Sequence, residues 1–336
     1  MCQMAHKKGD LNNTMYFNTI QMPVFSGCAI ITTYRCNAHC KMCSRWQHQS
    51  NINSEFKPEL LLKLPKIHFI NITGGEPFLR SDIEEIVKIA HQKANRVVIS
   101  TNGIMSEQIV SLMRKYPKTG LRISLEGLKE TNDKIRGINN GYDNAMTLLK
   151  RLKRIGCKDI GVSITVNDDN YKEVIPLYEI CQKNGYEFAT GTIHSSYFFE
   201  TEGEVNFKHP KEICSVLEEL ADRMKKDGSI KNKYRAIFNE ELIKYVNHKP
   251  IAFPCKCASH FFVLDPCGQM FACVGSQKPM IMGDLNKKSF EKIWYSGQAN
   301  EVRKQVSTCN RSCCMSGNVA GEMKRNALLL TARIRL

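Results

Sequence analysis

The stretch Tyr34-Arg35-Cys36-Asn37-Ala38-His39-Cys40-Lys41-Met42-Cys43 places three thiols at C-x3-C-x2-C spacing, directly after the apolar run from Ala29 to Tyr34. A closed structural zinc site uses four ligands. A cuboidal iron–sulfur cluster held by three thiolates keeps one iron open for another ligand, and soft thiolates suit either metal. Three cysteines on one buried helix face are the alternative, but the polar residues between the thiols favour a loop that holds a metal.

Strand-like and helix-like runs alternate from Gly27 onward. The expected strands are 29–34, 67–73, 96–101, 121–125, 159–166 and 186–192. The helical runs between them are 58–63, 82–93, 106–115, 142–155 and 171–184, and further helices are expected at 214–226 and 240–246. Six β–α units in a row predict an α/β fold with a parallel sheet, whereas a complete barrel of this kind has eight.

Three further motifs follow directly after expected strands, where barrels of this kind carry their chemistry. Gly74-Gly75-Glu76-Pro77 follows the second strand, and its glycines allow the backbone to approach a ligand closely. Thr101-Asn102-Gly103 ends the third strand. Ser124-Leu125-Glu126-Gly127 ends the fourth, and Ile135-Arg136-Gly137 comes soon after it. Ordinary turns, and a surface charge in the case of Arg136, are the alternative interpretations.

A second group of cysteines begins at Pro254-Cys255-Lys256-Cys257. A strand and turn, 261–268, follows, and its last residue Gly268 precedes Cys273 at G-x4-C spacing. Cys309-x3-Cys313-Cys314 comes later in a polar stretch. A hairpin with thiols at both ends is one way to hold a metal. A four-thiolate zinc site has the same ligands as an iron–sulfur cluster and stays open as an alternative.

Together these motifs resemble the radical S-adenosylmethionine (SAM) superfamily with a C-terminal twitch/SPASM extension, over about residues 27 to 316. The resemblance implies a partial (βα)6 TIM-like barrel followed by a small cysteine-rich auxiliary-cluster domain. The expected divisions are an N-terminal lead at 1–26, the barrel core at 27–200, bridging helices at 201–250, the auxiliary domain at 251–316 and a tail at 317–336.

In that family the open iron of a [4Fe–4S] cluster binds SAM, and one electron cleaves SAM to a 5′-deoxyadenosyl radical that takes a hydrogen atom from the substrate. The resemblance assigns this cluster to Cys36, Cys40 and Cys43. It assigns contacts with SAM to Met42, Gly74, Gly75, Glu76, Pro77, Thr101, Asn102, Ser124, Arg136, Val166 and Asn167. Ser124 and Arg136 would bind the SAM carboxylate, which a guanidinium pairs with bidentately. Many members have Asp where this chain has Glu126, a mild departure.

The extension implies one auxiliary [4Fe–4S] cluster, ligated by Cys255, Cys273, Cys309 and Cys313. Cys257 can replace Cys255 and Cys314 can replace Cys313, because both spacings are tolerable. The two-cluster pattern of the family ends in a longer cysteine ladder than this chain has, which speaks against a second auxiliary cluster.

Composition narrows the class of protein. The chain has 336 residues, of which 42% are hydrophobic, enough for one large domain and a small one. No apolar run is long enough to span a bilayer, and Met1 to Asn18 lack the apolar core of a signal peptide, so we expect a cytoplasmic protein with no membrane partner. Fifteen cysteines then indicate metal binding or catalysis. The net charge of +15 comes without a basic patch interleaved with aromatics, so nucleic acid is not an expected partner.

The sequence leaves several classes of substrate open. Twitch/SPASM relatives modify ribosomal peptides, protein side chains, and sugar or cyclitol alcohols. Only 26 residues precede the barrel, too few for a leader-binding domain, so we favour a sugar-like small molecule that is oxidised or otherwise modified with help from the auxiliary cluster. A peptide maturase with a separate leader-binding partner is the alternative. An electron donor such as flavodoxin or ferredoxin is expected. A non-catalytic metal- or RNA-binding protein on the same fold is the alternative of another class.

Overall fold

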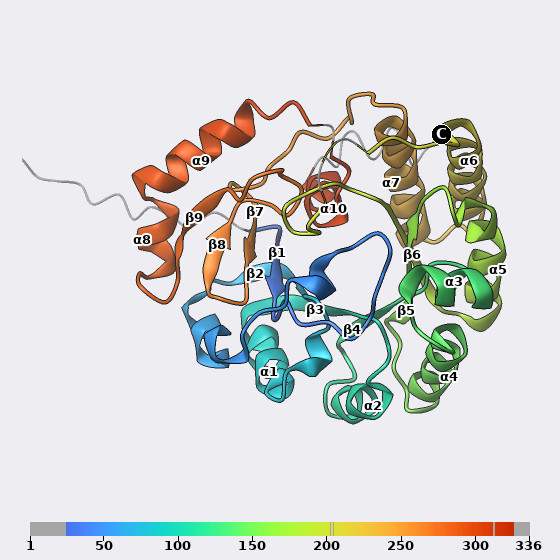
Figure 1. Cartoon of the computed structure of the whole chain (residues 1–336), viewed down its shortest axis with the longest axis horizontal. Coiled ribbons are helices and arrows are strands. Elements are labelled where there is room, and N and C mark those ends of the chain that lie inside the picture. Colours follow the sequence, from blue (N-terminus) through green and yellow to red (C-terminus); the bar gives the residue numbers. More distant parts are fainter. Residues whose placement is uncertain (1–24, 202, 204, 312, 326–336) are drawn as a thin grey trace, which may run out of the picture.

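The computed structural model describes residues 25–201, 203, 205–311 and 313–325. Most of the expected lead 1–26 and the end of the expected tail therefore lie outside the described residues. The described chain forms one nine-stranded sheet in the order β6-β5-β4-β3-β2-β1-β7-β8-β9 (Figure 1). The strands are β1 (Gly27–Ile31), β2 (Ile67–Thr73), β3 (Ala94–Thr101), β4 (Gly120–Ser124), β5 (Ile160–Val166), β6 (Glu187–Thr192), β7 (Phe261–Leu264), β8 (Gln269–Phe271) and β9 (Ile281–Asp284).

Strands β1 to β6 are parallel and curve into a partial barrel with helices on its outer side, which confirms the predicted α/β class (Figure 1). The helices are α1 (Ile83–Lys93), α2 (Ser106–Lys115), α3 (Lys129–Arg136), α4 (Gly141–Arg154), α5 (Val174–Asn184), α6 (Pro210–Lys226), α7 (Ile230–Val246), α8 (Phe290–Trp294), α9 (Gly297–Ser307) and α10 (Ser316–Arg325). The run expected to be helical at 58–63 is a 3₁₀ helix, Pro58–Lys63.

Several local predictions differ from the structure. The helix expected at 240–246 begins at Ile230, where the Ser229 side chain caps it by accepting from Asn232 N. The first strand ends at Ile31 rather than Tyr34, because after the bond from Thr32 N to Thr73 O the chain leaves the sheet to form the cysteine loop. Helix α3 was not predicted, because its eight residues, KETNDKIR, are almost all polar and show no helical stripe of apolar side chains.

The cysteine-rich C-terminal part extends the barrel sheet. Strand β7 pairs in parallel with β1, with Phe262 opposite Cys28, and β8 and β9 follow as antiparallel strands. Helices α8 and α9 pack beside β9 (Figure 1). The two groups of cysteines therefore belong to one continuous sheet, although more than 200 residues separate them along the chain.

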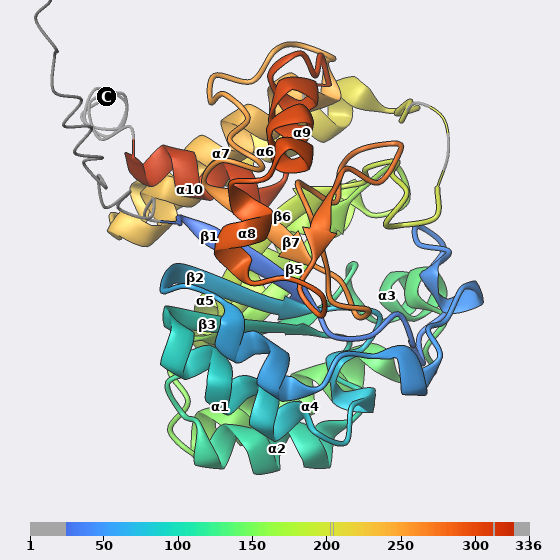
Figure 2. The same cartoon turned by 90° about the vertical axis from the view of Figure 1, so that its left-hand side faces the viewer.

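Helices α7 and α10 lie on the side of the barrel that the strands leave open. Helix α7 contacts β6, and α10 contacts β1, β7 and α7 (Figures 1 and 2). Glycines permit this close approach, since a Cβ at Gly317 would lie 2.9 Å from the Phe261 ring and one at Gly321 would lie 2.8 Å from Ser26 Oγ. The sequence had left residues 317–336 unassigned; the first part of that stretch belongs to a helix that completes the wall of the barrel.

Small side chains line much of the lumen of the barrel. The strands direct Ala29, Asn71, Ser100, Ser163 and Ala189 into it, whereas complete barrels fill this space with branched apolar residues. The result is a cavity of about 1440 Å³ that runs from the barrel to the C-terminal cysteines. The bulky apolar residues of the strands point outward to the helices instead, among them Ile70, Ile72, Val97, Ile99, Leu121, Ile123, Val162 and Ile164.

No helix in the described part of the chain is long and apolar enough to cross a membrane.

We expect two glycines of neighbouring strands to respond oppositely to alanine. A Cβ at Gly161 would lie 1.9 Å from the carbonyl oxygen of Glu187, whereas a Cβ at Gly191 would meet nothing within 4 Å. Gly161→Ala should therefore lower the free energy of unfolding by about 1–3 kcal/mol or more, and Gly191→Ala should change it by less than about 0.5 kcal/mol. Denaturant unfolding followed by circular dichroism measures both; equal effects would contradict the described packing of β5 on β6.

Candidate active site

The three-thiol loop is seated on the C-terminal end of α3. His39 N donates to Arg136 O at 3.1 Å, and Lys41 N donates to Ile135 O at 2.9 Å. Gly137 ends α3 with a φ of +61°, and a Cβ there would lie 2.9 Å from His39 O, so glycine suits both the backbone conformation and the contact. The position of the thiols thus depends on a helix that the sequence pattern did not indicate.

The thiols of Cys36, Cys40 and Cys43 lie in this loop, each half-buried. Burial raises the pKa of Cys36 to about 11, and it also raises the pKa of Cys40 and of Cys43. Without a metal these groups therefore stay protonated at neutral pH, and metal binding would release their protons. In the part of the chain that the structure describes, no three or more His, Cys, Asp or Glu side chains are gathered so as to hold a single metal ion. In a cuboidal cluster each thiolate binds a different iron.

A buried ion pair stands beside the thiols. Arg136 Nη1 donates to Glu126 Oε1 at 3.0 Å, and Glu126 Oε2 accepts from Thr165 N at 2.8 Å; the two side chains are 8% and 2% exposed. Burial disfavours the charged form of Arg136. Electrostatic attraction to Cys40, Glu126 and Cys36 outweighs the effect of burial and raises the pKa of Arg136. Arg136 Nε is buried and has no hydrogen-bond partner among the described residues. This orphan donor fits an anionic group bound beside the thiols.

The Gly-Gly-Glu-Pro loop and the Thr-Asn-Gly turn meet through Glu76. This fully buried carboxylate accepts from Phe78 N at 3.1 Å, from Thr101 Oγ1 at 2.8 Å and from Asn102 N at 2.7 Å. Asn102 Nδ2 then donates to Asn37 Oδ1 in the cysteine loop at 2.7 Å. Glu76 thus joins its own loop to the Thr-Asn-Gly turn, and Asn102 joins that turn to the cysteine loop. Both residues position these loops.

The paired glycines also have a packing role. A Cβ at Gly75 would lie 2.1 Å from Arg35 O, and one at Gly74 would lie 2.6 Å from Thr33 O. Gly75 N donates to Thr33 O at 2.8 Å and Glu76 N to Arg35 O at 2.8 Å. Glycine here lets the loop after β2 lie directly on the start of the cysteine loop.

The other residues predicted to contact SAM lie in or near the same edge of the barrel. Met42 is half-buried in the cysteine loop, and Pro77 is buried at the start of a short 3₁₀ turn, Pro77–Leu79. Ser124 and Val166 are the last residues of β4 and β5. The side chain of Asn167, unlike the others, is engaged within its own turn: its Nδ2 donates to Thr165 O and its Oδ1 accepts from Asp169 N. The structure therefore gives Asn167 a local structural role.

Arg45 connects the cysteine loop with the C-terminal cysteines. Its Nε donates to Phe198 O at 2.8 Å and its Nη2 to Tyr197 O at 2.9 Å, while its guanidinium lies 4.3 Å from the centre of the Tyr34 ring. Tyr197 in turn donates from its hydroxyl to Cys273 O at 3.3 Å. The segment 197–198 therefore contacts Arg45, just after the cysteine loop, and the backbone of Cys273.

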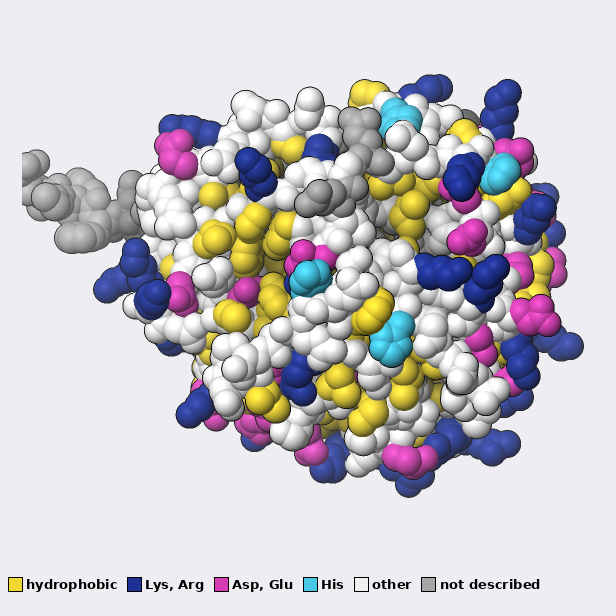
Figure 3. Space-filling model, viewed as in Figure 1, with side chains coloured by type: hydrophobic (Ala, Val, Ile, Leu, Met, Phe, Trp, Pro, Cys, Tyr) yellow, Lys and Arg dark blue, Asp and Glu magenta, His cyan; other side chains and the backbone are white. Residues whose placement is uncertain are grey.

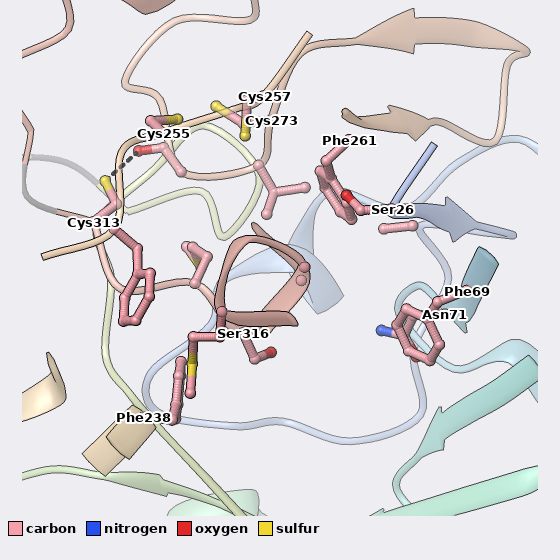
Figure 4. Close-up of a pocket in the computed structure, with 18 of the residues that line it drawn as sticks. Ser26, Phe69, Asn71, Phe238, Cys255, Cys257, Phe261, Cys273, Cys313 and Ser316 are labelled. Atoms are coloured by element: carbon pink, nitrogen blue, oxygen red, sulfur yellow. Dashed lines mark hydrogen bonds between the residues drawn. The ribbon is translucent and has the colours of Figure 1, made fainter. Parts of the chain in front are cut away.

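Three of the C-terminal thiols lie next to one another (Figure 4). Cys257 is buried and hydrogen-bonds with both Cys255 and Cys273. The hydrogen bond from Cys257, the Ser276 hydroxyl and the N–H groups of Gly275 and Ser276 lower the pKa of Cys273 to about 6. A thiol that is already ionised near neutral pH, in a turn of N–H donors, fits a metal ligand.

The remaining cysteines of this region divide into two kinds. Cys309 and Cys313 line the same cavity as Cys255, Cys257 and Cys273, and Cys313 Sγ lies 3.9 Å from Gly275 O. The cavity lining includes neither Cys314 nor Cys267. Cys314 is buried near Glu241 and Lys244 of α7, and burial raises its pKa. The structure thus places Cys257 next to Cys255 and Cys273, with Cys309 and Cys313 on the wall of the same cavity and Cys314 near α7.

The motifs had already singled out Glu126, Arg136 and Asn37, but the bonds that these residues make in the site had no signal in the sequence. Glu126 and Arg136 are ten positions apart on different elements, and Arg45, Asn37 and Tyr197 fall in irregular segments. Only their bonds in the folded chain show what they do. The position of Arg45, two residues beyond the last cysteine of the loop, was the one available hint.

Comparisons with known families and proteins agree with this arrangement. The family model of the radical SAM superfamily matches residues 30–181, and the SPASM model, described as an iron–sulfur cluster-binding domain, matches residues 255–315. Fe-coproporphyrin III synthase of Methanosarcina barkeri is 31% identical over 160 residues, which are 45% of this chain and 39% of that protein. The sporulation killing factor maturation protein SkfB of Bacillus subtilis is 28% identical over 189 residues, 54% of this chain and 44% of that protein.

A longer alignment joins the chain to a probable GTP 3′,8-cyclase of Saccharolobus islandicus, 28% identical over 240 residues, 68% of this chain and 76% of that protein. The alignments with the synthase and with SkfB span less than half of those proteins. Among solved structures, anSMEcpe with bound AdoMet and a Cp18Cys peptide has a TM-score of 0.64 at 16% identity, over 92% of this chain and 98% of that chain. SuiB of Streptococcus suis bound to S-adenosylmethionine has a TM-score of 0.63 at 14% identity, over 90% and 75%. These likenesses show a shared fold.

We predict that Glu126→Gln destabilises the protein strongly. The substitution leaves the buried guanidinium of Arg136 without its counter-charge, so the free energy of unfolding should fall by about 3–5 kcal/mol. The matched control is Glu107→Gln, which removes the partner of Arg151 on the surface and should leave the unfolding midpoint unchanged. If denaturant titrations find the two variants alike, the Glu126–Arg136 pair does not hold this end of the barrel.

A second prediction separates the C-terminal thiols. Cys257→Ala should lose about four irons per chain after anaerobic reconstitution, the content of one [4Fe–4S] cluster, because Cys257 lies between Cys255 and Cys273. Cys314→Ala is the control and should keep its iron, since that thiol faces α7. Iron analysis with absorption spectroscopy measures both variants; loss of iron from the Cys314 variant alone would refute this assignment.

Proposed function

We propose that this chain, which belongs to the radical SAM superfamily and carries a SPASM domain, cleaves SAM reductively and takes a hydrogen atom from a substrate held in the barrel cavity. The two matched domains imply a [4Fe–4S] cluster that binds SAM, SAM itself and auxiliary iron–sulfur chemistry. The observation that carries the proposal is the loop with only three thiols, next to a buried guanidinium that keeps one N–H without a partner.

Cys36, Cys40 and Cys43 would hold the first cluster, and Cys257 with Cys273, Cys313 and either Cys255 or Cys309 would hold one auxiliary cluster. When bound, the first cluster and SAM supply a 5′-deoxyadenosyl radical that is able to take a hydrogen atom. The chain's own residues set the conditions for this chemistry.

Arg136 offsets the negative charge that gathers where three thiolates bind iron, and its orphan Nε–H is available to an anionic group such as the SAM carboxylate. Glu126 prevents the guanidinium from turning away, because it is itself tied to Thr165 N of the neighbouring strand. Glu76 keeps the loops after β2 and β3 together at the same place. These residues position the reacting groups.

The cavity is the proposed substrate site. It adjoins the predicted SAM residues through Thr73 and Ser100, which directly precede Gly74 and Thr101, and reaches the C-terminal thiols at its other wall. A substrate in this cavity is shielded from bulk water, which limits side reactions of a radical. The C-terminal thiols on that wall would hold the auxiliary cluster, which would supply electron-transfer chemistry beside the substrate. A small molecule that fits inside the barrel is the substrate we favour.

A second candidate is the modification of a peptide. It is favoured by the sequence likeness to SkfB, a maturation protein by name. A peptide would enter the cavity with one side chain and would need a partner that binds the rest of it. Incubating the reconstituted enzyme with candidate peptides and small molecules, followed by mass spectrometry of the products, distinguishes the two candidates.

We expect Cys40→Ala to abolish 5′-deoxyadenosine formation from SAM under reducing, anaerobic conditions, because a loop with two thiols cannot hold the cluster. The control is Cys157→Ala, which removes a thiol outside both groups and should retain most of the activity. Chromatography of the nucleoside product measures both. Cleavage of SAM by the Cys40 variant, or a fully reconstituted wild-type protein that leaves SAM intact, would refute the proposed reaction.

A further inference from the structure

The charges around the barrel cavity are of one sign. Five cationic side chains line it in the described structure, namely Arg96, Arg122, Lys231, Arg235 and Arg311. No Asp or Glu is among the described residues that line it. A lining of this kind disfavours cations and attracts anions.

Four of these cations form the floor of the cavity, at the end of the barrel opposite the three-thiol loop. Asp159 lies behind them and accepts from Arg96 Nη2 at 2.8 Å, from Arg122 Nη2 at 2.6 Å and from Lys231 Nζ at 3.2 Å. Glu187 also lies behind them and accepts from Lys231 Nζ at 2.6 Å and from Arg235 Nη2. The network fixes the four side chains where the strands begin.

The two carboxylates do not balance the four cations. Two positive charges are left over on the floor, and the donors are not all used, since Arg96 bonds Asp159 only through Nε and Nη2. Arg96 and Lys231 are 39% and 43% exposed, so their charged ends are accessible from the cavity or from solvent. The surplus charge and the unused donors leave Arg96 and Lys231 able to bind an anionic group.

Much of the body of the cavity is apolar, and strands as well as helices supply this lining: Phe69 lies on β2, Phe261 on β7 and Phe238 on α7. Phe69, Phe238 and Phe261 point toward the space around α10 (Figure 4), and we call these three side chains the aromatic wall. The apolar lining also includes Phe25, Phe253, Met280, Met315 and Met323. On the face seen in Figure 3, hydrophobic side chains appear in the hollows near the middle, while Lys and Arg lie mostly around the outline. An apolar body with a cationic end is a site for an amphiphilic molecule.

We propose that the substrate is an amphiphilic anion, whose apolar body lies against the aromatic wall and whose carboxylate or phosphate group binds Arg96 and Lys231 on the floor. The inference rests on the proposed function, because it takes the cavity as the substrate site. A neutral sugar would leave both the aromatic wall and the surplus charge unused, and an ammonium group would be repelled. The reacting carbon lies at the end of the substrate near the three-thiol loop, and the anion fixes how deeply the substrate enters.

Two probes with nearly the same aromatic body test this inference without any turnover. 8-Anilinonaphthalene-1-sulfonate carries an anionic group, and N-phenyl-1-naphthylamine is its uncharged counterpart. Each is titrated against the reconstituted full chain and followed by probe fluorescence. The wild-type protein should bind the sulfonate about tenfold or more tightly than the amine, as expected for one or two charge-assisted hydrogen bonds.

The variants Lys231→Gln and Arg96→Gln should each weaken binding of the sulfonate about tenfold and leave binding of the amine within about twofold. Both replaced side chains are partly exposed, and thermal melts followed by circular dichroism check that the variants fold. Arg151→Gln is the control, because that arginine pairs with Glu107 on the surface and does not line the cavity; it should change neither affinity.

Displacement of the sulfonate by octyl phosphate or by octanoate then identifies which anion the floor prefers, with octanol as the uncharged comparison. Equal binding of the two probes, equal losses for both probes in the floor variants, or displacement by octanol as strong as by the anions would overturn the inference. Failure of this inference can be told from failure of the proposed function, because formation of 5′-deoxyadenosine is measured in a separate assay.

Discussion

The buried pair of Arg136 and Glu126 is the interaction on which the active end of the barrel depends. A guanidinium without contact with water is tolerated only if other groups compensate its charge and its donors. Glu126 supplies one carboxylate oxygen to it and gives the other to the backbone of β5. The carbonyl groups of Ile135 and Arg136 meanwhile hold the cysteine loop. One side chain thereby links α3, the ends of β4 and β5, and the three thiols.

A hollow barrel lacks the core contacts that stabilise a filled one, and the C-terminal half of the chain supplies other contacts in their place. Small residues along the strands forgo the packing that fills complete barrels, which leaves space for a ligand but removes contacts that would stabilise the sheet. Strand β7 extends the sheet beside β1, and α7 and α10 cover the open side. The segment that carries Tyr197 and Phe198 then joins Arg45, just after the cysteine loop, to the backbone of Cys273. The cavity and the segments that carry the two groups of thiols are therefore parts of one framework.

The alternation of runs along the sequence predicts the parallel sheet well, because buried strands and amphipathic helices carry strong local patterns. Strands β2 to β6 and helix α2 lie where those patterns place them, within about two residues. Helix α3 has almost no apolar residues, so no apolar stripe predicts it; in the fold it packs against α4 and accepts hydrogen bonds from the cysteine loop. The choice between Cys255 and Cys257 could not be made from spacing, since both distances to Gly268 are acceptable; only the fold shows that Cys257 contacts Cys273. The role of Glu126 is of the same kind, because pairing between distant elements has no periodicity.

The central claim is that Cys36, Cys40 and Cys43 hold a cluster with one iron left open for SAM. Electron paramagnetic resonance of the reduced, reconstituted protein, recorded with and without SAM, tests it most directly. If SAM binds to the open iron, its addition changes the g values of one cluster and leaves the signal of the auxiliary cluster as it was. A spectrum that SAM does not alter would contradict the account.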